Sequence, residues 1–473
     1  MLGLLFVAST ALVPSAPLLP SLHRPPPPRI LRAPIITAAS PQRSDTAAIV
    51  NRVGAVVAPT TTFIILFQSL RITLAINGIQ VPASIVGMLG GFALLCCLPQ
   101  KTAKRLEAFF EPACRLFRDW LAAIFSPNFT ALPLTMPPVP ARDLLTFIAF
   151  LIFGFGVTVG TNAAIATALA PRKAIQFDEG AADLSTPDAG PPPTPPNPYP
   201  IAQQRAFVVF ALLFASIHLF TRDALTLNLC LFATTLGSYS LATTLTPPKL
   251  KLWLHPFVTT SAATFLACTA IGAAVGDTWR APLSIYSRQG SGAGFLISQL
   301  MGPCVLSFAF QLYTYRAQLR RRFIQIIGTC LTGSFLAMLT SAAAGRLAGL
   351  APVLRLALVS RNTISPIALE TAKLLKVEPA ALGLLGAFVT GLLAFPLGKL
   401  VLDKLRVNDP AARGLSLAGT AHGGGLLALS DEAEAFPFAA LSMNLSAACA
   451  VVLLSVPAIR RLVLTVALGR AAL

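Results

Sequence analysis

The chain has 473 residues, of which 55% are hydrophobic and only 11% are charged, with a mean hydropathy of +0.72 and a formal net charge of +18. Soluble globular proteins carry about 25% charged residues, so this composition excludes a soluble enzyme, a disordered protein and a secreted disulfide scaffold, and it predicts an all-α polytopic membrane protein. Because the basic residues lie in short clusters between apolar runs, the positive charge indicates membrane topology, and we expect no nucleic-acid partner.

Residues 1–44 have the composition of a targeting leader. They contain no acidic residue, several Arg, Ser and Thr residues, and four consecutive prolines from Pro25 to Pro28. Acid-poor, basic and hydroxylated leaders are typical of organellar transit peptides. The apolar run over 2–13, followed by Ser15-Ala16, resembles the core of a signal peptide. We therefore predict a transit peptide, in a bipartite form with a signal segment in front; an ordinary signal peptide is the alternative.

Long uncharged runs follow the leader. A membrane-spanning helix needs about 20 apolar residues, and most of these runs are long enough, so with short hairpins we expect about 11–13 membrane segments. The eight Cys residues lie mostly in apolar runs and form no C-x-x-C pair, so we predict no metal site. The runs cover residues 53–70, 72–100, 144–170, 206–221, 224–248, 252–276, 289–315, 323–345, 379–398, 414–430 and 435–459.

One proline-rich stretch divides the chain. Residues 171–200 contain nine Pro residues and four acidic residues, which is typical of an extended, solvated linker. It separates an N-terminal membrane module, residues 45–170, from a larger C-terminal module, residues 201–473. We expect the C-terminal module to carry the chemistry.

Gly302-Pro303 interrupts the apolar run 289–315. A helix broken here would form a pair with a second break later in the module. Two interrupted segments at related positions in two halves are the best sequence indication of a transport site at the membrane midplane. The alternative interpretation is that Gly302-Pro303 simply starts a helix.

The second break is predicted just before Pro366. Proline removes a backbone donor and disfavours helix in the residue before it, so a new helix would start at membrane depth, and its free N–H groups would bind anions. Arg361 beside it would add a full positive charge and a bidentate fork for a carboxylate. Alternatively, Arg361 reaches the membrane surface and Pro366 only kinks a helix. The polar residues of this segment are Ser360, Arg361, Asn362, Thr363 and Ser365.

A glycine-rich stretch follows Arg413. Four glycines lie within residues 419–425, together with Thr420 and His422, in an uncharged run too short and too rich in glycine to be one stable helix. A re-entrant or broken element lining a cavity fits this pattern, with Gly423, Gly424 and Gly425 shaping the break. His422 would be able to couple transport to protons; a structural histidine at a turn is the alternative.

Enzymatic function is not expected. The sequence His-Gly-Gly-Gly at residues 422–425 is similar to the oxyanion loop of esterases, but the chain contains no G-x-S-x-G nucleophile motif. The glycines of residues 290–294 miss the G-x-G-x-x-G spacing and do not follow a strand. We therefore predict no catalytic residues, no cofactor and no metal.

Several of these motifs occur in the order and spacing of the LrgB family. They are Gly302-Pro303, Gln311-Leu-Tyr313, Pro366-Ile-Ala368, the segment 409–414 and Thr420-Ala-His422. The N-terminal module resembles LrgA, through residues 81–88 and the prolines between Pro127 and Pro140. A fused LrgA–LrgB protein behind a transit peptide resembles the plastidal glycolate/glycerate translocators. Two departures from the family pattern are residues 361–365, which read Arg-Asn-Thr-Ile-Ser, and Leu426 after the glycines.

The resemblance implies a multi-pass carrier of the plastid inner envelope that exports glycolate and imports glycerate, with proton coupling or exchange. The partners expected for such a carrier are small organic anions as substrates and the lipid bilayer around it. A homo-oligomer is a further expectation. Two alternatives are a holin-like or regulatory membrane assembly and a carrier of pyruvate or lactate. We expect Arg361, Asn362, Thr363 and Ser365 to hold the substrate, with Thr420 and His422 opposite. The expected hinge residues are Gly302, Pro303, Pro366, Gly423, Gly424 and Gly425.

Overall fold

A computed structural model of the chain describes residues 42–79, 81–136, 139–171, 199–247, 250 and 254–469. The predicted leader, residues 1–44, lies outside the described residues except for its last three, and most of the predicted linker also lies outside them. The described part is helical and contains no strand. The all-α prediction is therefore confirmed for these residues.

Among the described residues, six helices precede the linker and the others follow it. The first six are α2 (Gln42–Ile76), α3 (Ala83–Cys97), α4 (Gln100–Asp119), α5 (Leu121–Thr130), α6 (Leu132–Thr135) and α7 (Ala141–Ala168). Next come α8 (Ile201–Thr221), α9 (Ala224–Leu245), α10 (Pro256–Ala274), α11 (Arg280–Ser287), α12 (Ala293–Ser298), α13 (Met301–Thr314), α14 (Arg316–Arg321) and α15 (Phe323–Leu347). The last are α16 (Pro352–Val359), the 3₁₀ turn η2 (Ser360–Asn362), α17 (Ser365–Leu374), α18 (Ala381–Leu393), the π-helical turn η3 (Ala394–Gly398), α19 (Lys399–Lys404), α20 (Pro410–Ala428), α21 (Phe436–Ser455) and α22 (Pro457–Leu468).

Nine helical segments of the described residues are long and apolar enough to cross a membrane. Two further apolar helices, Ala83–Cys97 and Leu121–Thr135, are shorter. We expected about 11–13 membrane segments with short hairpins allowed for, and the described residues contain nine long and two shorter apolar helices. Many large apolar side chains face outward, among them Phe153 and Phe220, which are 71% and 91% exposed. Such a surface is suited to lipid rather than to water.

Local sequence explains where several helices begin and bend. Asp223 and Asp409 cap α9 and α20, because their carboxylates accept hydrogen bonds from backbone N–H groups of the first turn. Pro366 lies in the first turn of α17, where its missing N–H costs nothing. Pro396 lies inside η3, and its missing donor accounts for the local widening of the helix there.

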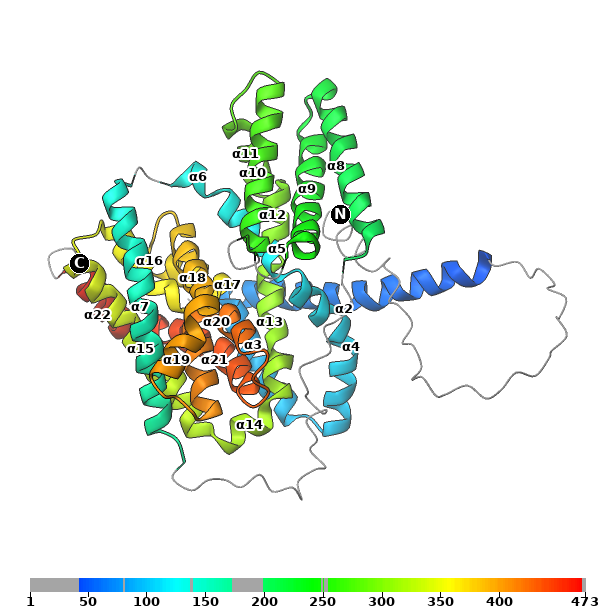
Figure 1. Cartoon of the computed structure of the whole chain (residues 1–473). Helices are drawn as coiled ribbons and strands as arrows, with labels where there is room; N and C mark the ends of the chain where they lie inside the picture. Colours follow the sequence, from blue (N-terminus) through cyan, green and yellow to red (C-terminus); the bar gives the residue numbers. More distant parts are fainter. Residues whose placement is uncertain are drawn as a thin grey trace, which may run out of the picture.

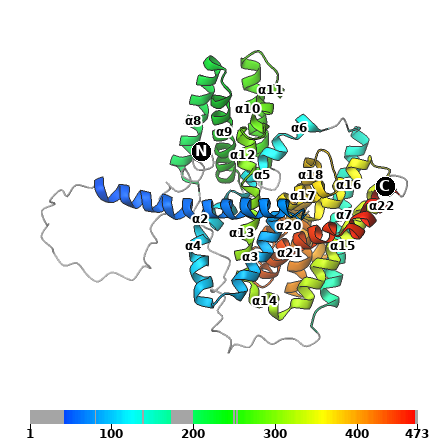
Figure 2. The ribbon, with the colours of Figure 1, turned by 180° about the vertical axis from the view of Figure 1, so that it is seen from behind.

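The helices form two bundles joined by a central helix (Figure 1). In one bundle α8–α12 pack around α5, and in the other α7 packs with α15–α22. Helix α13 runs between the bundles, in contact with α3, α4 and α2. Seen from behind, α2 crosses the back of α13 (Figure 2). This arrangement places two of the three predicted breaks, before α17 and within α20, in the bundle that contains α7.

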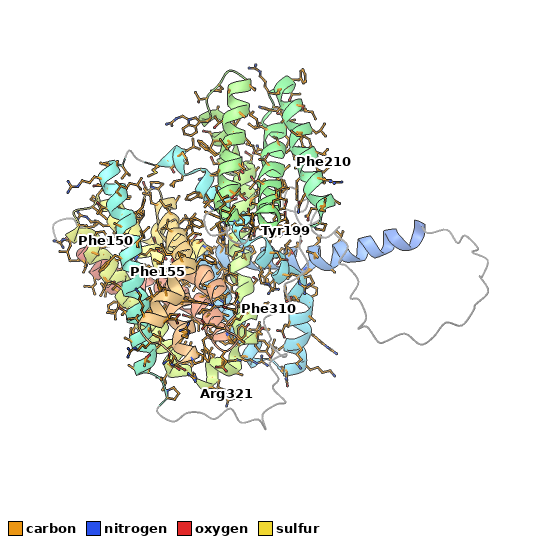
Figure 3. All side chains as sticks on the ribbon, in the orientation of Figure 1. Phe150, Phe155, Tyr199, Phe210, Phe310 and Arg321 are labelled. Carbon is orange, nitrogen blue, oxygen red and sulfur yellow. The ribbon has the colours of Figure 1, made fainter. Side chains whose placement is uncertain are left out.

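The parts before and after the linker share one hydrophobic core. Phe310 of α13 lies against Phe63 of α2 and Phe110 of α4, with ring centroids 5.9 Å and 5.2 Å away. Tyr199, directly after the undescribed linker residues, packs against Trp120 at 5.0 Å. Figure 3 shows side chains filling the space around Phe310 and Tyr199, which are labelled there. The division into two modules remains a sequence prediction, and in space the two parts interlock.

Candidate functional site

The helix containing Arg361 is interrupted before Pro366. Helix α16 ends at Val359, η2 holds residues 360–362, and the backbone is then extended at Thr363 and Ile364 before α17 begins. The N-terminus of α17 has no side-chain cap. The break is buried, since Arg361 and Asn362 are only 3% and 4% exposed.

Arg361 is held by three groups from α7 and α15. Its Nε donates to Ser341 Oγ at 3.0 Å, and its Nη2 donates to the Gly154 carbonyl at 3.1 Å and to Thr158 Oγ1 at 2.8 Å. Glycine at position 154 lets the guanidinium lie close to α7, because a Cβ there would be 3.0 Å from Nη2 and the guanidinium would have to shift by a few tenths of an ångström. The guanidinium is therefore fixed in place by neutral groups.

No carboxylate compensates this charge. In the part of the chain that the structure describes, Arg361 takes part in no ion pair, and its Nη1 is buried with no hydrogen-bond partner. An unpaired buried charge costs several kcal/mol, roughly, after relaxation of the protein. Such a charge favours an anionic ligand.

Another break lies within α20, at His422. This residue has φ 51° and ψ −123°, so two helical pieces meet there at a kink. Its Nε2 lies 3.2 Å from the carbonyl oxygen of Arg361. Because a carbonyl can only accept, Nε2 carries the hydrogen and Nδ1 is left with a lone pair. Nδ1 is buried without a partner. The structure thus brings the two breaks into direct contact.

The three glycines after His422 play different parts. A Cβ at Gly424 would lie 2.0 Å from the carbonyl oxygen of Gly391 on α18, and one at Gly425 would lie 2.6 Å from the carbonyl oxygen of Leu417. Nothing lies within 4 Å of a Cβ at Gly423. Close packing therefore requires glycine at 424 and 425 but not at 423.

Sequence reasoning missed the contribution of α7. Asn162 is 4% exposed, and its Nδ2 donates to Thr420 Oγ1 at 3.1 Å, while its Oδ1 is buried without a partner. Gly154, Thr158 and Asn162 are spaced four residues apart, so they lie on one face of the helix. That spacing of small and polar residues within an apolar run was the signal available in the sequence.

The other predicted substrate residues differ in their surroundings. Both polar atoms of the Asn362 side chain are buried without a partner. Thr363 donates its hydroxyl hydrogen to the Ser360 carbonyl at 2.8 Å, so only its lone pairs remain available. Ser365 is half-buried in the first turn of α17. Among these three residues, Asn362 offers the most unused hydrogen-bonding capacity.

Gly302 and Pro303 lie in the first turn of α13, directly after the interruption between α12 and α13. A Cβ at Gly302 would lie 2.1 Å from the ring of Phe67 on α2. No hydrogen bond within the described ranges joins these two residues to the Arg361 cluster. The structure therefore gives this pair a close helix contact with α2.

A cavity of about 80 Å³ borders Arg361 between α7, α15 and α16. Its polar lining comes from Arg361, Ser341 and Thr340. A larger hollow of about 430 Å³ lies on another side of α7, between it and α19, and its lining is apolar. Phe153 and Val157 line both spaces. The space beside the guanidinium suits a small ligand.

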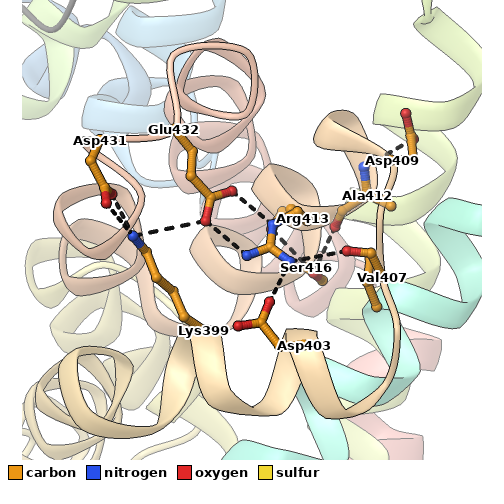
Figure 4. Close-up of polar contacts among 9 residues, drawn as sticks. All are labelled: Lys399, Asp403, Val407, Asp409, Ala412, Arg413, Ser416, Asp431 and Glu432. Atoms are coloured by element: carbon orange, nitrogen blue, oxygen red, sulfur yellow. Dashed lines mark hydrogen bonds and ion pairs between the residues drawn. The ribbon is translucent and has the colours of Figure 1, made fainter.

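A network of ion pairs joins the start of α20 to the residues that follow its C-terminus and to α19 (Figure 4). Arg413 forms a bidentate pair with Glu432, with distances of 2.7 Å and 2.8 Å, and also contacts Asp403 at 2.8 Å. Lys399 binds Asp431, and this bond keeps the pKa of the Asp431 carboxyl below its usual value. Nine residues separate Arg413 from His422, about 13 Å along a helix. The network therefore lies away from the kink at His422 and ties the residues on either side of α20 to each other.

We expect Glu432→Gln to lower the free energy of unfolding by about 1–3 kcal/mol, because it removes a charge-assisted bidentate pair that is largely shielded from solvent. Asp431→Asn is the matched control; Asp431 is 71% exposed, so its loss should change stability by less than about 0.5 kcal/mol. Thermal unfolding of both variants in detergent measures the difference. Equal effects of the two substitutions would contradict the assigned role of Glu432.

Within the described segments, no group of three or more His, Cys, Asp and Glu side chains lies together as metal ligands would. All eight Cys residues are free. The site is thus built from a buried cation, amides, hydroxyls and an imidazole.

Comparison with known proteins identifies the family. The LrgB-like family matches residues 235–459. The plastidal glycolate/glycerate translocator 1 of Arabidopsis thaliana, a chloroplastic protein, is 31% identical over 401 residues, which are 82% of this chain and 76% of that protein. The chain belongs to the LrgB-like family. This confirms the predicted resemblance.

Bacterial relatives match a smaller part of this LrgB-like protein. The uncharacterized protein YwbG of Bacillus subtilis is 30% identical over 132 residues, 28% of this chain and 58% of that protein. An uncharacterized protein of Haemophilus influenzae is 33% identical over 126 residues, 27% of this chain and 54% of that protein. No solved structure matches the chain. The family match includes Arg361, Thr420 and His422, whereas Thr158 and Asn162 precede it.

Proposed function

We propose that this LrgB-like protein is a carrier of small 2-hydroxycarboxylates that exports glycolate and imports glycerate across the plastid inner envelope. The observation that carries the proposal is the buried Arg361, whose Nη1 has no partner and whose charge has no carboxylate beside it among the described residues. A carboxylate would pair with this guanidinium through charge-assisted hydrogen bonds. The relative from Arabidopsis, named a glycolate/glycerate translocator, supports the choice of substrates.

The surroundings of Arg361 favour a small substrate with further polar groups. Asn362 and His422 supply buried donors and acceptors that lack partners. Buried polar atoms are nearly always hydrogen-bonded in native proteins, so a cluster without partners indicates a ligand or ordered water. The cavity at Arg361, about 80 Å³, has room for only a few atoms. These features suit glycolate and glycerate better than a large anion.

The contact between the two breaks suggests how transport proceeds. His422 and Arg361 meet through a single hydrogen bond, and each lies where a helix is interrupted. Irregular backbone at membrane depth is found where it lines a substrate path. In our proposal α17 and α20 move relative to α7 and α15 and expose Arg361 to each side in turn. His422 Nδ1, a free acceptor, is the group that would take up a coupled proton.

Purified protein in liposomes tests the function. Glycolate uptake is expected to saturate with concentration and to accelerate when the vesicles contain glycerate, because a carrier returns faster with a bound substrate. The holin-like alternative predicts leakage that does not saturate and that includes unrelated solutes of similar size. Leakage of that kind, with no acceleration by internal glycerate, would exclude the carrier. Protein-free vesicles provide the background rate.

A further inference from the structure

Asn162 lies on α7, before the proline-rich stretch, but contacts the centre of the candidate site. Its Nδ2 reaches Thr420 Oγ1 at 3.1 Å. One turn earlier on the same helix, Thr158 contacts Nη2 of Arg361 at 2.8 Å. Residues four apart on a helix face have Cβ atoms about 5–6 Å apart. Asn162 is therefore one helical turn from the residue that contacts the guanidinium.

The hydrogen-bond network fixes which way the Asn162 amide points. Thr420 donates its only hydroxyl hydrogen to the Ser416 carbonyl at 2.8 Å. The Thr420 oxygen can then only accept, so it must face the NH₂ group of Asn162. The Asn162 carbonyl oxygen, Oδ1, is left as a buried acceptor without a partner. Oδ1 packs against Gly333 of α15, where a side chain would not fit, since a Cβ at Gly333 would lie 2.2 Å from Oδ1.

Resting on the proposed function, we infer that Asn162 selects 2-hydroxycarboxylates over 2-ketocarboxylates by accepting a hydrogen bond from the substrate 2-hydroxyl. The cavity at Arg361 is lined on α7 by Phe150, Phe153, Gly154 and Val157. In the inferred complex the carboxylate pairs with Nη1 of Arg361 and the substrate extends from this cavity past Thr158, so that its 2-hydroxyl lies next to Asn162. A hydroxyl can donate to Oδ1, whereas a keto oxygen would place two acceptors together and leave Oδ1 unsatisfied. His422 Nδ1 is another free acceptor, but it can take up a proton and become a donor, which the Asn162 carbonyl cannot.

Competition against radiolabelled glycolate in liposomes tests the inference, with lactate and pyruvate as a pair that differs at the 2-position. In the wild type, lactate should inhibit about tenfold or more better than pyruvate, the effect of one unsatisfied buried acceptor. In Asn162→Ala the preference should largely disappear, with the remaining inhibition governed by the carboxylate. Because the measure is a ratio of inhibition constants, it does not depend on how much protein is active.

Two further variants sharpen the test. Gly333→Ala would push the Asn162 amide away from its place and should also reduce the preference. Thr161→Val, one residue before Asn162, is the control; its exposed hydroxyl bonds only to its own helix, at Val157, and its preference should equal that of the wild type.

Three results would overturn the inference. Equal inhibition by lactate and pyruvate in the wild type would do so even if no variant folds. A wild-type preference that persists in Asn162→Ala would remove Asn162 from selection while leaving the carrier intact. Absence of saturable glycolate uptake in the wild type would instead overturn the proposed function, and the inference with it.

Discussion

Arg361→Gln is expected to abolish saturable glycolate uptake while the protein still folds and inserts. The substitution removes the charge that would bind the carboxylate. Removing one partner of a buried charge pair costs about 2–5 kcal/mol, which corresponds to roughly thirty-fold to a few thousand-fold in affinity. Without substrate, the variant no longer contains a buried charge that lacks a counter-ion. Its free energy of unfolding should therefore fall by less than its affinity for glycolate does. Uptake in liposomes and thermal unfolding in detergent measure the two effects separately.

The controls distinguish charge from geometry. Arg361→Lys keeps the charge but loses the planar fork that contacts Ser341, Gly154 and Thr158 together, so it should bind glycolate more weakly than the wild type and better than Arg361→Gln. Arg461→Gln removes an exposed arginine from α22 and should leave uptake unchanged. Normal saturable uptake by well-folded Arg361→Gln would remove Arg361 from the substrate site.

The second large effect is expected at the kink of α20. Gly424→Ala would place a methyl group 2.0 Å from the carbonyl oxygen of Gly391 and 3.0 Å from its Cα, so backbone must move to accept it. Overpacking of this kind costs about 1–3 kcal/mol and occasionally more. We expect a lower melting temperature and a smaller yield of folded protein, because α18 and α20 can no longer pack at their present distance.

Gly423→Ala is the matched control for this prediction. The substitution is the same and the residue is adjacent, but nothing lies within 4 Å of the added Cβ. Alanine also stabilises a helix by about 1 kcal/mol relative to glycine. Thermal unfolding of Gly423→Ala should therefore match or exceed that of the wild type. A Gly424→Ala variant as stable as Gly423→Ala would show that α18 and α20 are not in close contact.

Composition and local pattern were sufficient to predict the fold class. The scarcity of charge required membrane-embedded helices, and Pro366 and the glycines of residues 419–425 indicated interruptions that the structure contains. These features act within a few residues, so the sequence displays them directly. Arg361 could be proposed as a substrate residue for a similar reason, because an arginine in an apolar region is rare.

Contacts between distant segments could not be predicted in this way. Thr158 and Gly154 contact Arg361 across 203 and 207 residues, and nothing near them in the sequence indicates that α7 packs against η2. The division at residues 171–200 also led us to expect the chemistry in the C-terminal module, whereas α7, which precedes the division, supplies hydrogen bonds to Arg361 and Thr420. Gly302-Pro303 fitted a local pattern too, yet in space Gly302 accommodates Phe67 of α2.

The position of α7 also constrains how the protein is made. Asn162 and Thr158 enter the membrane on a helix that is synthesised more than 190 residues before Arg361 and Thr420. Until those partners arrive, the polar side chains of α7 must find other hydrogen bonds within the membrane, through their own helix, water or an insertion factor. The site is therefore completed only late in biogenesis, when the last quarter of the chain returns to a helix that was inserted near the beginning.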